Sequence, residues 1–264
     1  MTSIKTIKLA AVSRNYFNMP IWVADYCGLF EEENIQVDIE LYEPIDEVTE
    51  RLEKGQVQLA LGVTEHIILN HEAGGSLTII GGNVNKLPFS LIAKPSIREF
   101  NDLKNKIIGV SSKSAGSSSL IMKILETRGL RYPQDYDLAE VGPILARWEK
   151  LQSGEIDAGL QGTPLNQIAL EQGYVSIVEP KNYFPHFQFT SLNVDKHWAR
   201  SNSELVASFM RAFIRAHRLF FSDQKLMGEI AVKETGITRK HADIAWKEYT
   251  EENIFSAEGD ISLE

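Results

Sequence analysis

Two stretches of this chain share one pattern. Residues 51–58 read Arg-Leu-Glu-Lys-Gly-Gln-Val-Gln, and residues 150–157 read Lys-Leu-Gln-Ser-Gly-Glu-Ile-Asp. In each, a helix-length segment stops at a glycine and leads into a short apolar run, which is the pattern of a helix followed by a strand. A threonine then follows at the same distance, Thr64 in the first stretch and Thr163 in the second. We therefore predict an internal duplication that gives two similar α/β lobes.

Around these stretches, strand-length apolar runs alternate with helix-length segments, which favours parallel strands joined by crossover helices. The fold class is α/β, with two parallel-sheet lobes. The predicted strands are 4–12, 35–42, 57–62, 77–83, 107–111, 138–141 and 156–161. The predicted helices are 20–33, 44–54, 64–72, 116–128, 143–153 and 163–172, with Thr64 and Thr163 as caps. Beyond residue 194 only helices are expected, at about 201–221, 225–235 and 239–253.

The amino-acid composition excludes several classes of protein and of partner. The chain has 264 residues, of which 43% are hydrophobic and 24% are charged, so it can bury a conventional core and is neither disordered nor dependent on disulfide bonds. The single cysteine, Cys27, cannot form an internal disulfide. A net charge of -9 argues against nucleic acid as a partner, because a phosphate backbone needs clustered lysine and arginine.

No uninterrupted apolar run approaches the length of a membrane span, and the run at residues 9–12 is too short for a signal peptide. We expect a protein with no membrane span. It is periplasmic or extracytoplasmic if a leader has been removed, and cytoplasmic if Met1 is the native start.

In open parallel sheets, ligands bind beyond the carboxyl ends of the strands. The loops expected there carry hydroxyl, amide, imidazole and aromatic side chains and almost no carboxylates, which suits a small polar or anionic ligand. If the lobes face each other, these loops line one shared cleft. The predicted ligand-binding residues are Tyr16, Asn18, Thr64, His66, Asn85, Ser112, Gly116, Ser117, Thr163 and His186.

Two of these segments have alternative interpretations. In residues 111–119, Ser-Ser-Lys-Ser-Ala-Gly-Ser-Ser-Ser, a strand enters a loop that opens a helix. Its backbone N–H groups and hydroxyls either bind an anion or simply cap the helix. Residues 16–19, Tyr-Phe-Asn-Met, form either a stacking wall for the ligand or an apolar plug at a helix start.

Catalytic and metal chemistry is not favoured. His66 and His71 lie five residues apart, about 140° around a helix, so they do not readily share a metal ion. Neither a nucleotide-binding glycine motif nor a zinc or serine-hydrolase motif is present. We predict no metal, no cofactor and no catalytic residue.

Three motifs resemble one family. Residues 22–31, Trp-Val-Ala-Asp-Tyr-Cys-Gly-Leu-Phe-Glu, are similar to the opening of substrate-binding proteins of ABC importers for sulfonate, nitrate, taurine and thiamine precursors. Residues 100–110, Phe-Asn-Asp-Leu-Lys-Asn-Lys-Ile-Ile-Gly-Val, resemble the entry to their second lobe, and residues 151–158 resemble their L-x-x-G-x-I-D-A motif.

The resemblance implies a type II periplasmic-binding fold with a double crossover hinge, near residues 91–94 and 190–194. Lobe one would comprise residues 1–92 and 190–264, and lobe two residues 93–189. It further implies a monomeric solute-binding protein that captures a small organic metabolite between its lobes, closes on it and delivers it to an ABC permease.

The same family also contains enzymes, so the alternative is a cytoplasmic decarboxylase, lyase or desulfinase that uses His66 and cleft hydroxyls. A pyrimidine-forming synthase of thiamine biosynthesis resembles this chain around His66, with a lysine four residues before the histidine. Here Gly62 occupies that position and the synthase's cysteine-rich cluster is absent, which argues against that activity. The sequence favours binding over catalysis.

Overall fold

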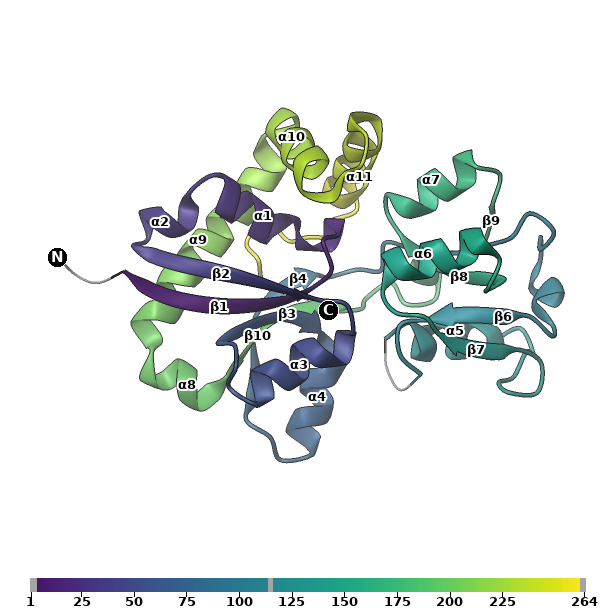
Figure 1. The fold of residues 1–264 in the computed structure, drawn as a ribbon, viewed down its shortest axis with the longest axis horizontal. Coiled ribbons are helices and arrows are strands. Elements are labelled where there is room, and N and C mark those ends of the chain that lie inside the picture. Colours follow the sequence, from purple (N-terminus) through teal and green to yellow (C-terminus); the bar gives the residue numbers. More distant parts are fainter. Residues whose placement is uncertain (1–3, 114–115, 262–264) are drawn as a thin grey trace. The chain divides into compact units, whose positions relative to one another are not determined.

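The computed structural model describes residues 4–113 and 116–261, and the chain divides into two compact units. The first unit comprises Met1–Tyr42, Asp46–Lys86 and Phe187–Glu264, and the second comprises Glu43–Ile45 and Leu87–His186. Each unit is built around a five-stranded sheet (Figure 1).

The sheet of the first unit has the order β2-β1-β3-β10-β4. Its strands are β1 (Lys5–Val12), β2 (Ile35–Tyr42), β3 (Leu59–Val63), β4 (Leu77–Val84) and β10 (Thr190–Asp195). β1 runs parallel to both of its neighbours, whereas β10 runs antiparallel to β3 and β4.

The sheet of the second unit repeats this arrangement in the order β7-β6-β8-β5-β9. Its strands are β5 (Phe89–Ala93), β6 (Ile107–Val110), β7 (Asp137–Glu140), β8 (Ala158–Gly162) and β9 (Val175–Val178). Here β5 is the antiparallel strand, between β8 and β9. The shared order and directions confirm two similar α/β lobes. The prediction of purely parallel sheets was wrong. β10 in the first sheet and β5 in the second pair antiparallel with both of their neighbours.

The predicted lobe boundaries differ from the observed division. A boundary after residue 92 cuts through β5, whose residues Phe89 to Ala93 pair in register with Gly162 to Ala158 of β8. The units divide instead at 86/87 and 186/187, just before β5 and β10, so that each antiparallel strand stays whole in the sheet that it completes.

Helices cover these sheets. The first unit holds α1 (Met19–Tyr26), α2 (Leu29–Glu32), α3 (Ile45–Glu53), α4 (Thr64–Glu72), α8 (Lys196–Ser201), α9 (Ser203–Ser222), α10 (Gln224–Thr235) and α11 (Arg239–Glu251). The second holds α5 (Ser117–Glu126), α6 (Ile144–Ser153) and α7 (Leu165–Glu171). Short 3-10 turns are η1 (Tyr16–Asn18), η2 (Phe100–Leu103) and η3 (Pro180–Asn182). The helix predicted over 20–33 is broken between α1 and α2 at Gly28, whose φ of 68° lies in the left-handed region that glycine tolerates.

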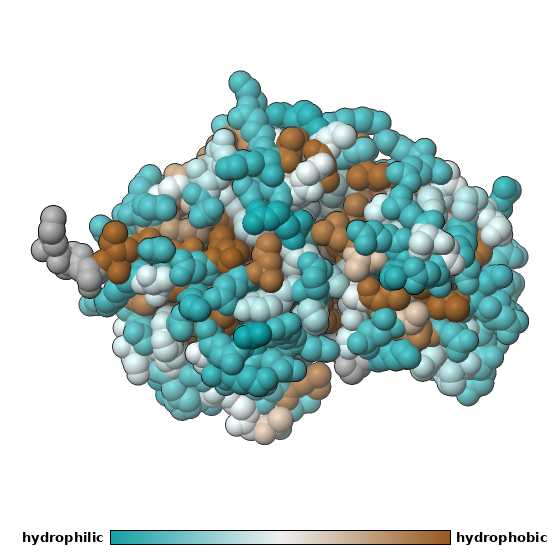
Figure 2. Space-filling view, in the orientation of Figure 1, coloured by the Kyte–Doolittle hydropathy of each residue, from teal (hydrophilic) through white to brown (hydrophobic). Residues whose placement is uncertain are grey.

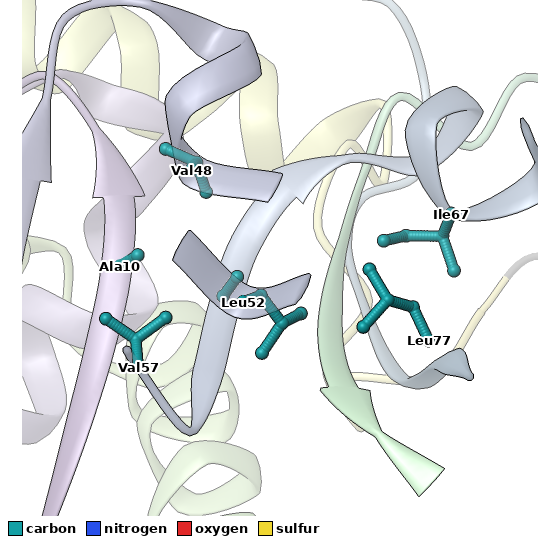
Figure 3. Close-up of a cluster of buried hydrophobic side chains, with 7 residues drawn as sticks. Ala10, Val48, Leu52, Val57, Ile67 and Leu77 are labelled. Atoms are coloured by element: carbon teal, nitrogen blue, oxygen red, sulfur yellow. The ribbon is translucent and has the colours of Figure 1, made fainter. Parts of the chain in front are cut away.

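One core of the first unit lies between the sheet and the helices α3 and α4. Val48 and Leu52, four residues apart on α3, face Ala10 of β1 and Val57 (Figure 3). Ile67 of α4 and Leu77 of β4 extend the same apolar cluster.

A second core lies on α9, whose buried residues recur every three or four positions. They are Leu205, Phe209, Ala212, Phe213, Ala216, His217 and Phe220. This helix packs on α1 and α2. The spacing is that of a helix with one buried stripe, which explains why the sequence predicted this helix well.

The surface mixes apolar and hydrophilic residues, as the face in Figure 2 shows. Large apolar side chains that remain exposed include Ile4, Ile68 and Leu69. Over the described residues, none of the helices is both long and apolar enough to cross a membrane.

Candidate functional site

Polar side chains close the turn at the carboxyl end of β1. Ser13 is fully buried with a φ of 48°, an uncommon conformation for a residue other than glycine, and its N–H donates to the Tyr42 carbonyl at 3.0 Å. The side-chain amides of Asn15 and Asn18 each donate to the Val12 carbonyl at 2.9 Å. The predicted site residue Asn18 is therefore engaged in shaping this strand end.

Tyr16, predicted to contact the ligand, lies in an aromatic core. It is only 3% exposed, and its ring centroid lies 4.9 Å from that of Tyr249 and 6.3 Å from that of Phe220. Of the two interpretations of residues 16–19, the structure places Tyr16 in the apolar plug. Its hydroxyl is buried and has no hydrogen-bond partner among the residues that the structure describes, and burial raises the pKa of this phenol well above its usual value.

We expect Tyr16→Phe to leave the fold as stable or to stabilise it by about 1 to 2 kcal/mol, because it removes a buried hydroxyl that makes no hydrogen bond. Urea denaturation checks this, with Tyr42→Phe as the control. The Tyr42 hydroxyl donates to Glu40 at 2.5 Å, so its loss gives no such gain. A destabilised Tyr16→Phe protein would show that the Tyr16 hydroxyl has a partner in solution.

Thr64 and Thr163 occupy equivalent positions, as the repeat predicted. The Thr64 N–H donates to the Phe189 carbonyl, and the Thr163 N–H donates to the Pro88 carbonyl, both at 3.0 Å. Each acceptor immediately precedes the antiparallel strand of its own sheet, β10 or β5. The predicted caps were wrong, since Val63 and Pro164 hold the cap positions. Each threonine instead extends the sheet by one hydrogen bond.

Both threonines are buried at the carboxyl edge of a sheet. The Thr64 hydroxyl donates to the Ser191 hydroxyl at 3.1 Å, and Ser191 in turn donates to Asn193 at 2.7 Å. A polar chain thus lies at the end of β3, where α/β sheets bind ligands.

His66 lies on the first turn of α4 and faces α3. Its Nδ1 lies 3.0 Å from the Thr49 hydroxyl, and its Nε2 lies 3.3 Å from an Asp46 carboxylate oxygen. These residues line a surface hollow of about 310 Å³ that also carries Glu50 and Glu53. Three carboxylates around the hollow make it a poor site for an anion. Within the described ranges, no three His, Cys, Asp or Glu side chains are grouped to hold a metal ion.

Asn85 and His186, two further predicted ligand-binding residues, lie in the segments that lead from one unit to the other along the chain. The Asn85 amide donates to the Asp260 carbonyl at 2.8 Å and accepts from Gln188 at 2.8 Å, so it fastens the C-terminal segment of the first unit. His186 is exposed in the segment between η3 and β10.

In the second unit, Ser112, Gly116 and Ser117 all lie buried around the start of α5. Gly116 precedes the helix with a φ of 68°. Ser114 and Ala115, in the middle of the predicted Ser/Gly loop, lie outside the described residues. The Ser117 hydroxyl oxygen accepts from the Ser111 N–H at 2.9 Å and lies 3.0 Å from the Ser111 hydroxyl oxygen.

A buried arginine, Arg147 of α6, is the residue that the sequence analysis missed. It is 2% exposed; its Nε donates to the Leu160 carbonyl at 2.8 Å and its Nη1 donates to the Ser117 hydroxyl at 3.2 Å. Over the part of the chain that the structure describes, no carboxylate pairs with it. Burial lowers the pKa of Arg147 to about 9, so the guanidinium still carries its charge at neutral pH.

The sequence held a sign of this burial. Arg147 shares one helix face with Ile144, Trp148 and Leu151, three or four residues away and all buried. Room for its side chain comes from Gly109 and Gly159, where a Cβ atom would lie only 3.3 and 2.9 Å from the Arg147 side chain. An arginine on the apolar face of a helix, together with glycines in the two strands that this face covers, indicates a buried charge.

Gln161 of β8 lies beside this group. It is fully buried, and among the described residues neither its amide nitrogen nor its amide oxygen has a hydrogen-bond partner. Buried amides are nearly always satisfied, so an orphaned one at the ligand-binding edge of a sheet points to a missing partner.

The chain matches one protein family over residues 15–225, which is most of its length. It belongs to the NMT1/THI5-like family. This membership agrees with the resemblance drawn from the three sequence motifs and with the observed fold.

Curated relatives of this NMT1/THI5-like chain are named as synthases. It is 29% identical over 170 residues to the 4-amino-5-hydroxymethyl-2-methylpyrimidine phosphate synthase of Schizosaccharomyces pombe, an alignment covering 63% of this chain and 47% of that protein. It is 28% identical over 162 residues to the Saccharomyces cerevisiae synthase THI13, covering 59% and 45%. The chain thus spans about half the length of the curated relatives that it matches.

Solved structures share the fold at low sequence identity. The alkanesulfonate-binding protein SsuA of Xanthomonas axonopodis pv. citri superposes with a TM-score of 0.79 at 15% identity, covering 94% of this chain and 85% of that one. The nitrate-binding protein NrtA of Synechocystis superposes with a TM-score of 0.78 at 12% identity, covering 92% and 69%. NrtA is named as a periplasmic binding protein, and the similarity to it confirms the periplasmic-binding fold for this NMT1/THI5-like chain.

Proposed function

We propose that this protein binds a small polar or anionic organic metabolite at the carboxyl ends of its parallel strands. The observation that carries this proposal is the buried Arg147, which lies next to Ser117 at the start of α5 and has no carboxylate partner within residues 4–113 and 116–261. A buried cation is costly unless an anion accompanies it, so an anionic ligand would supply what the protein alone lacks.

The duplicated strand ends support the same proposal. Thr64 and Thr163 are buried polar residues at the same place in the two sheets, at the strand ends where α/β sheets bind ligands. Each unit therefore carries a polar strand end at the place where sheets of this kind bind ligands.

As a solute-binding protein of ABC-type uptake, the chain would act as an extracytoplasmic monomer that hands its ligand to a permease. Support comes from the fold shared with SsuA and NrtA, which are named for binding alkanesulfonate and nitrate. A screen of small polar and anionic metabolites by thermal shift, followed by calorimetry, tests the binding proposal directly. A screen that yields no ligand contradicts it.

With the ligand in hand, we expect Thr163→Val to weaken binding by about 2- to 150-fold, the usual cost of removing one buried hydrogen-bonding hydroxyl. The matched control is Thr127→Val at the far end of α5, where the hydroxyl donates to the Ile124 carbonyl. Calorimetry on both variants gives the comparison. Equal losses of affinity would place the ligand away from the end of β8.

Catalysis on the same fold is the second candidate, because the curated relatives are named as synthases and His66 is oriented by both Thr49 and Asp46. An imidazole held on both sides is suited to acid–base chemistry. Nuclear magnetic resonance of the ligand after incubation with the protein separates the candidates. A ligand recovered unchanged supports binding, whereas conversion that is lost in His66→Gln supports the enzyme.

A further inference from the structure

The hydrogen bonds around Arg147 can be counted to find which hydroxyl group donates to which. The Ser117 hydroxyl oxygen accepts one bond from the Ser111 N–H and one from Arg147. A hydroxyl oxygen has two lone pairs, so both are occupied and its own hydrogen must be donated. The neighbouring acceptor is the Ser111 hydroxyl oxygen at 3.0 Å.

Ser111 is therefore the outer end of a relay. Its hydroxyl accepts from Ser117, which leaves its own hydrogen to be donated onward, and no acceptor for that hydrogen occurs among the described residues. Ser111 is also only half-buried, whereas Ser117 and Arg147 are buried. Arg147 is thus linked through the Ser117 hydroxyl to the accessible Ser111 hydroxyl, which it polarises.

Gln161 faces the same place. Gly109 and Gly159 pair in the parallel register of β6 and β8, and a Cβ on either would point at Arg147. Side chains two residues apart on a strand share a face, so Gln161, two residues after Gly159 on β8, lies on the Arg147 side of the sheet. Ser111 directly follows β6, the strand next to β8, and its hydroxyl contacts the Ser117 hydroxyl that Arg147 also contacts. The Gln161 amide, which has no hydrogen-bond partner among the described residues, offers a donor and an acceptor on that same side of the sheet.

We propose that Ser111 is the residue that donates to an oxyanion group of the ligand, that Arg147 and Ser117 are positioning residues that polarise it, and that Gln161 completes the contact. The inference deepens the proposed function and rests on it. One buried cation matches one negative charge, so the ligand class is a small organic acid whose carboxylate, sulfonate or phosphate group enters with a single charge. The N-terminus of α5, at Ser117, adds its positive dipole end.

The experiment titrates the full chain with acetate, methanesulfonate and inorganic phosphate at one ionic strength, with chloride as the reference ion. We expect at least one oxyanion to stabilise the wild-type protein. Arg147→Met and Ser111→Ala should each weaken its binding about 10- to 100-fold, because Ser111→Ala removes the donor to the anion and Arg147→Met removes the charge that polarises that donor. The control Ser153→Ala, an exposed hydroxyl on the same helix as Arg147, should keep the wild-type affinity.

Ligand-free stability separates a positioning role from a structural one. Replacing a buried, unpaired charge by an apolar side chain of similar length is often neutral or stabilising, so ligand-free Arg147→Met should melt at or above the wild-type temperature. A purely structural arginine predicts the reverse, a lower melting temperature with unchanged oxyanion affinity. Ser111→Ala keeps the test decisive if Arg147→Met fails to fold.

The outcomes also separate this inference from the proposed function. Wild-type oxyanion affinity in Ser111→Ala, or a wild type that binds only neutral metabolites, overturns the relay and leaves metabolite binding intact. A protein that binds neither the oxyanions nor any screened metabolite overturns both.

Discussion

Lowering the pH from 6.5 to 4 is expected to remove about 3 kcal/mol of stability from the first unit through one residue, His217. This imidazole is fully buried on α9 and donates from Nδ1 to the Ser256 carbonyl at 2.7 Å, while its Nε2 has no hydrogen-bond partner in the part of the chain that the structure describes. Burial lowers the pKa of His217 from 6.5 to about 4, and this effect outweighs the Ser256 carbonyl and Asp260, which both act to raise it.

The direction follows from proton linkage. The unfolded chain protonates His217 near pH 6.5, whereas the folded protein keeps it neutral down to about pH 4. Between these values the unfolded state binds more protons, so stability is complete above pH 6.5 and falls as the pH drops through the window. At about 1.4 kcal/mol per pH unit, the loss amounts to about 3 kcal/mol.

Urea denaturation at several pH values measures this loss, and the variant His217→Phe isolates it. The variant should be less stable than the wild type at pH 7.5 by about 1 kcal/mol, because the Ser256 carbonyl loses its donor, yet show a flatter profile between pH 6.5 and 4. His71→Gln, at an exposed position, is the control for losing an imidazole and should keep the steep wild-type fall because His217 is intact. Parallel profiles for the wild type and His217→Phe would show that His217 titrates normally.

The fold was largely predictable because the spacing of apolar residues along the sequence indicates strands and helices directly. The strands at 35–42 and 77–84 and the helices of the C-terminal region follow from period-two and period-3.6 patterns. The antiparallel strands β5 and β10 were not predicted as strands. Their apolar runs have no local feature that states which sheet they join, and that pairing is decided by contacts between residues about 70 and 130 positions apart.

The positions in the fold of several candidate residues were predictable, whereas their contacts were not, and their role in ligand binding stays a prediction. The matched positions of Thr64 and Thr163 follow from the repeat, and the start of α5 follows from the Ser/Gly segment. Tyr16 was misassigned because an aromatic residue after a strand looks the same whether it faces a ligand or the core. Arg147 was missed because a charged residue is expected at the surface, and only the glycines at 109 and 159 make room for it.

The aromatic core that captures Tyr16 also gives the largest expected loss of stability on mutation. Phe220 of α9 is fully buried, and its ring lies 5.0 Å from that of Phe255 and 6.3 Å from that of Tyr16. Truncating a buried phenylalanine removes its apolar contacts and leaves a cavity, which typically costs about 3 to 5 kcal/mol. We expect Phe220→Ala to destabilise the first unit by that amount.

The loss of stability in Phe220→Ala is expected to include more than the cavity, because Phe255 also packs on this ring. It is fully buried against Phe220, and the segment around it is tied to the first sheet by hydrogen bonds from the Asn85 N–H to the Ile254 carbonyl and from the Gly82 N–H to the Gly259 carbonyl. Removal of the Phe220 ring therefore also loosens the support of this C-terminal segment, which places the expected loss toward the upper end of the range.

Urea denaturation in a Trp148→Phe background measures the change, because the remaining tryptophans, Trp22, Trp198 and Trp246, all lie in the first unit. The neighbouring Phe221→Ala is the matched control. Phe221 is half-exposed and its truncation opens no enclosed cavity, so it should cost only about 1 kcal/mol. Similar losses for the two variants would mean that the Phe220 side chain is not held in a packed core, and that Tyr16 is free to face a ligand after all.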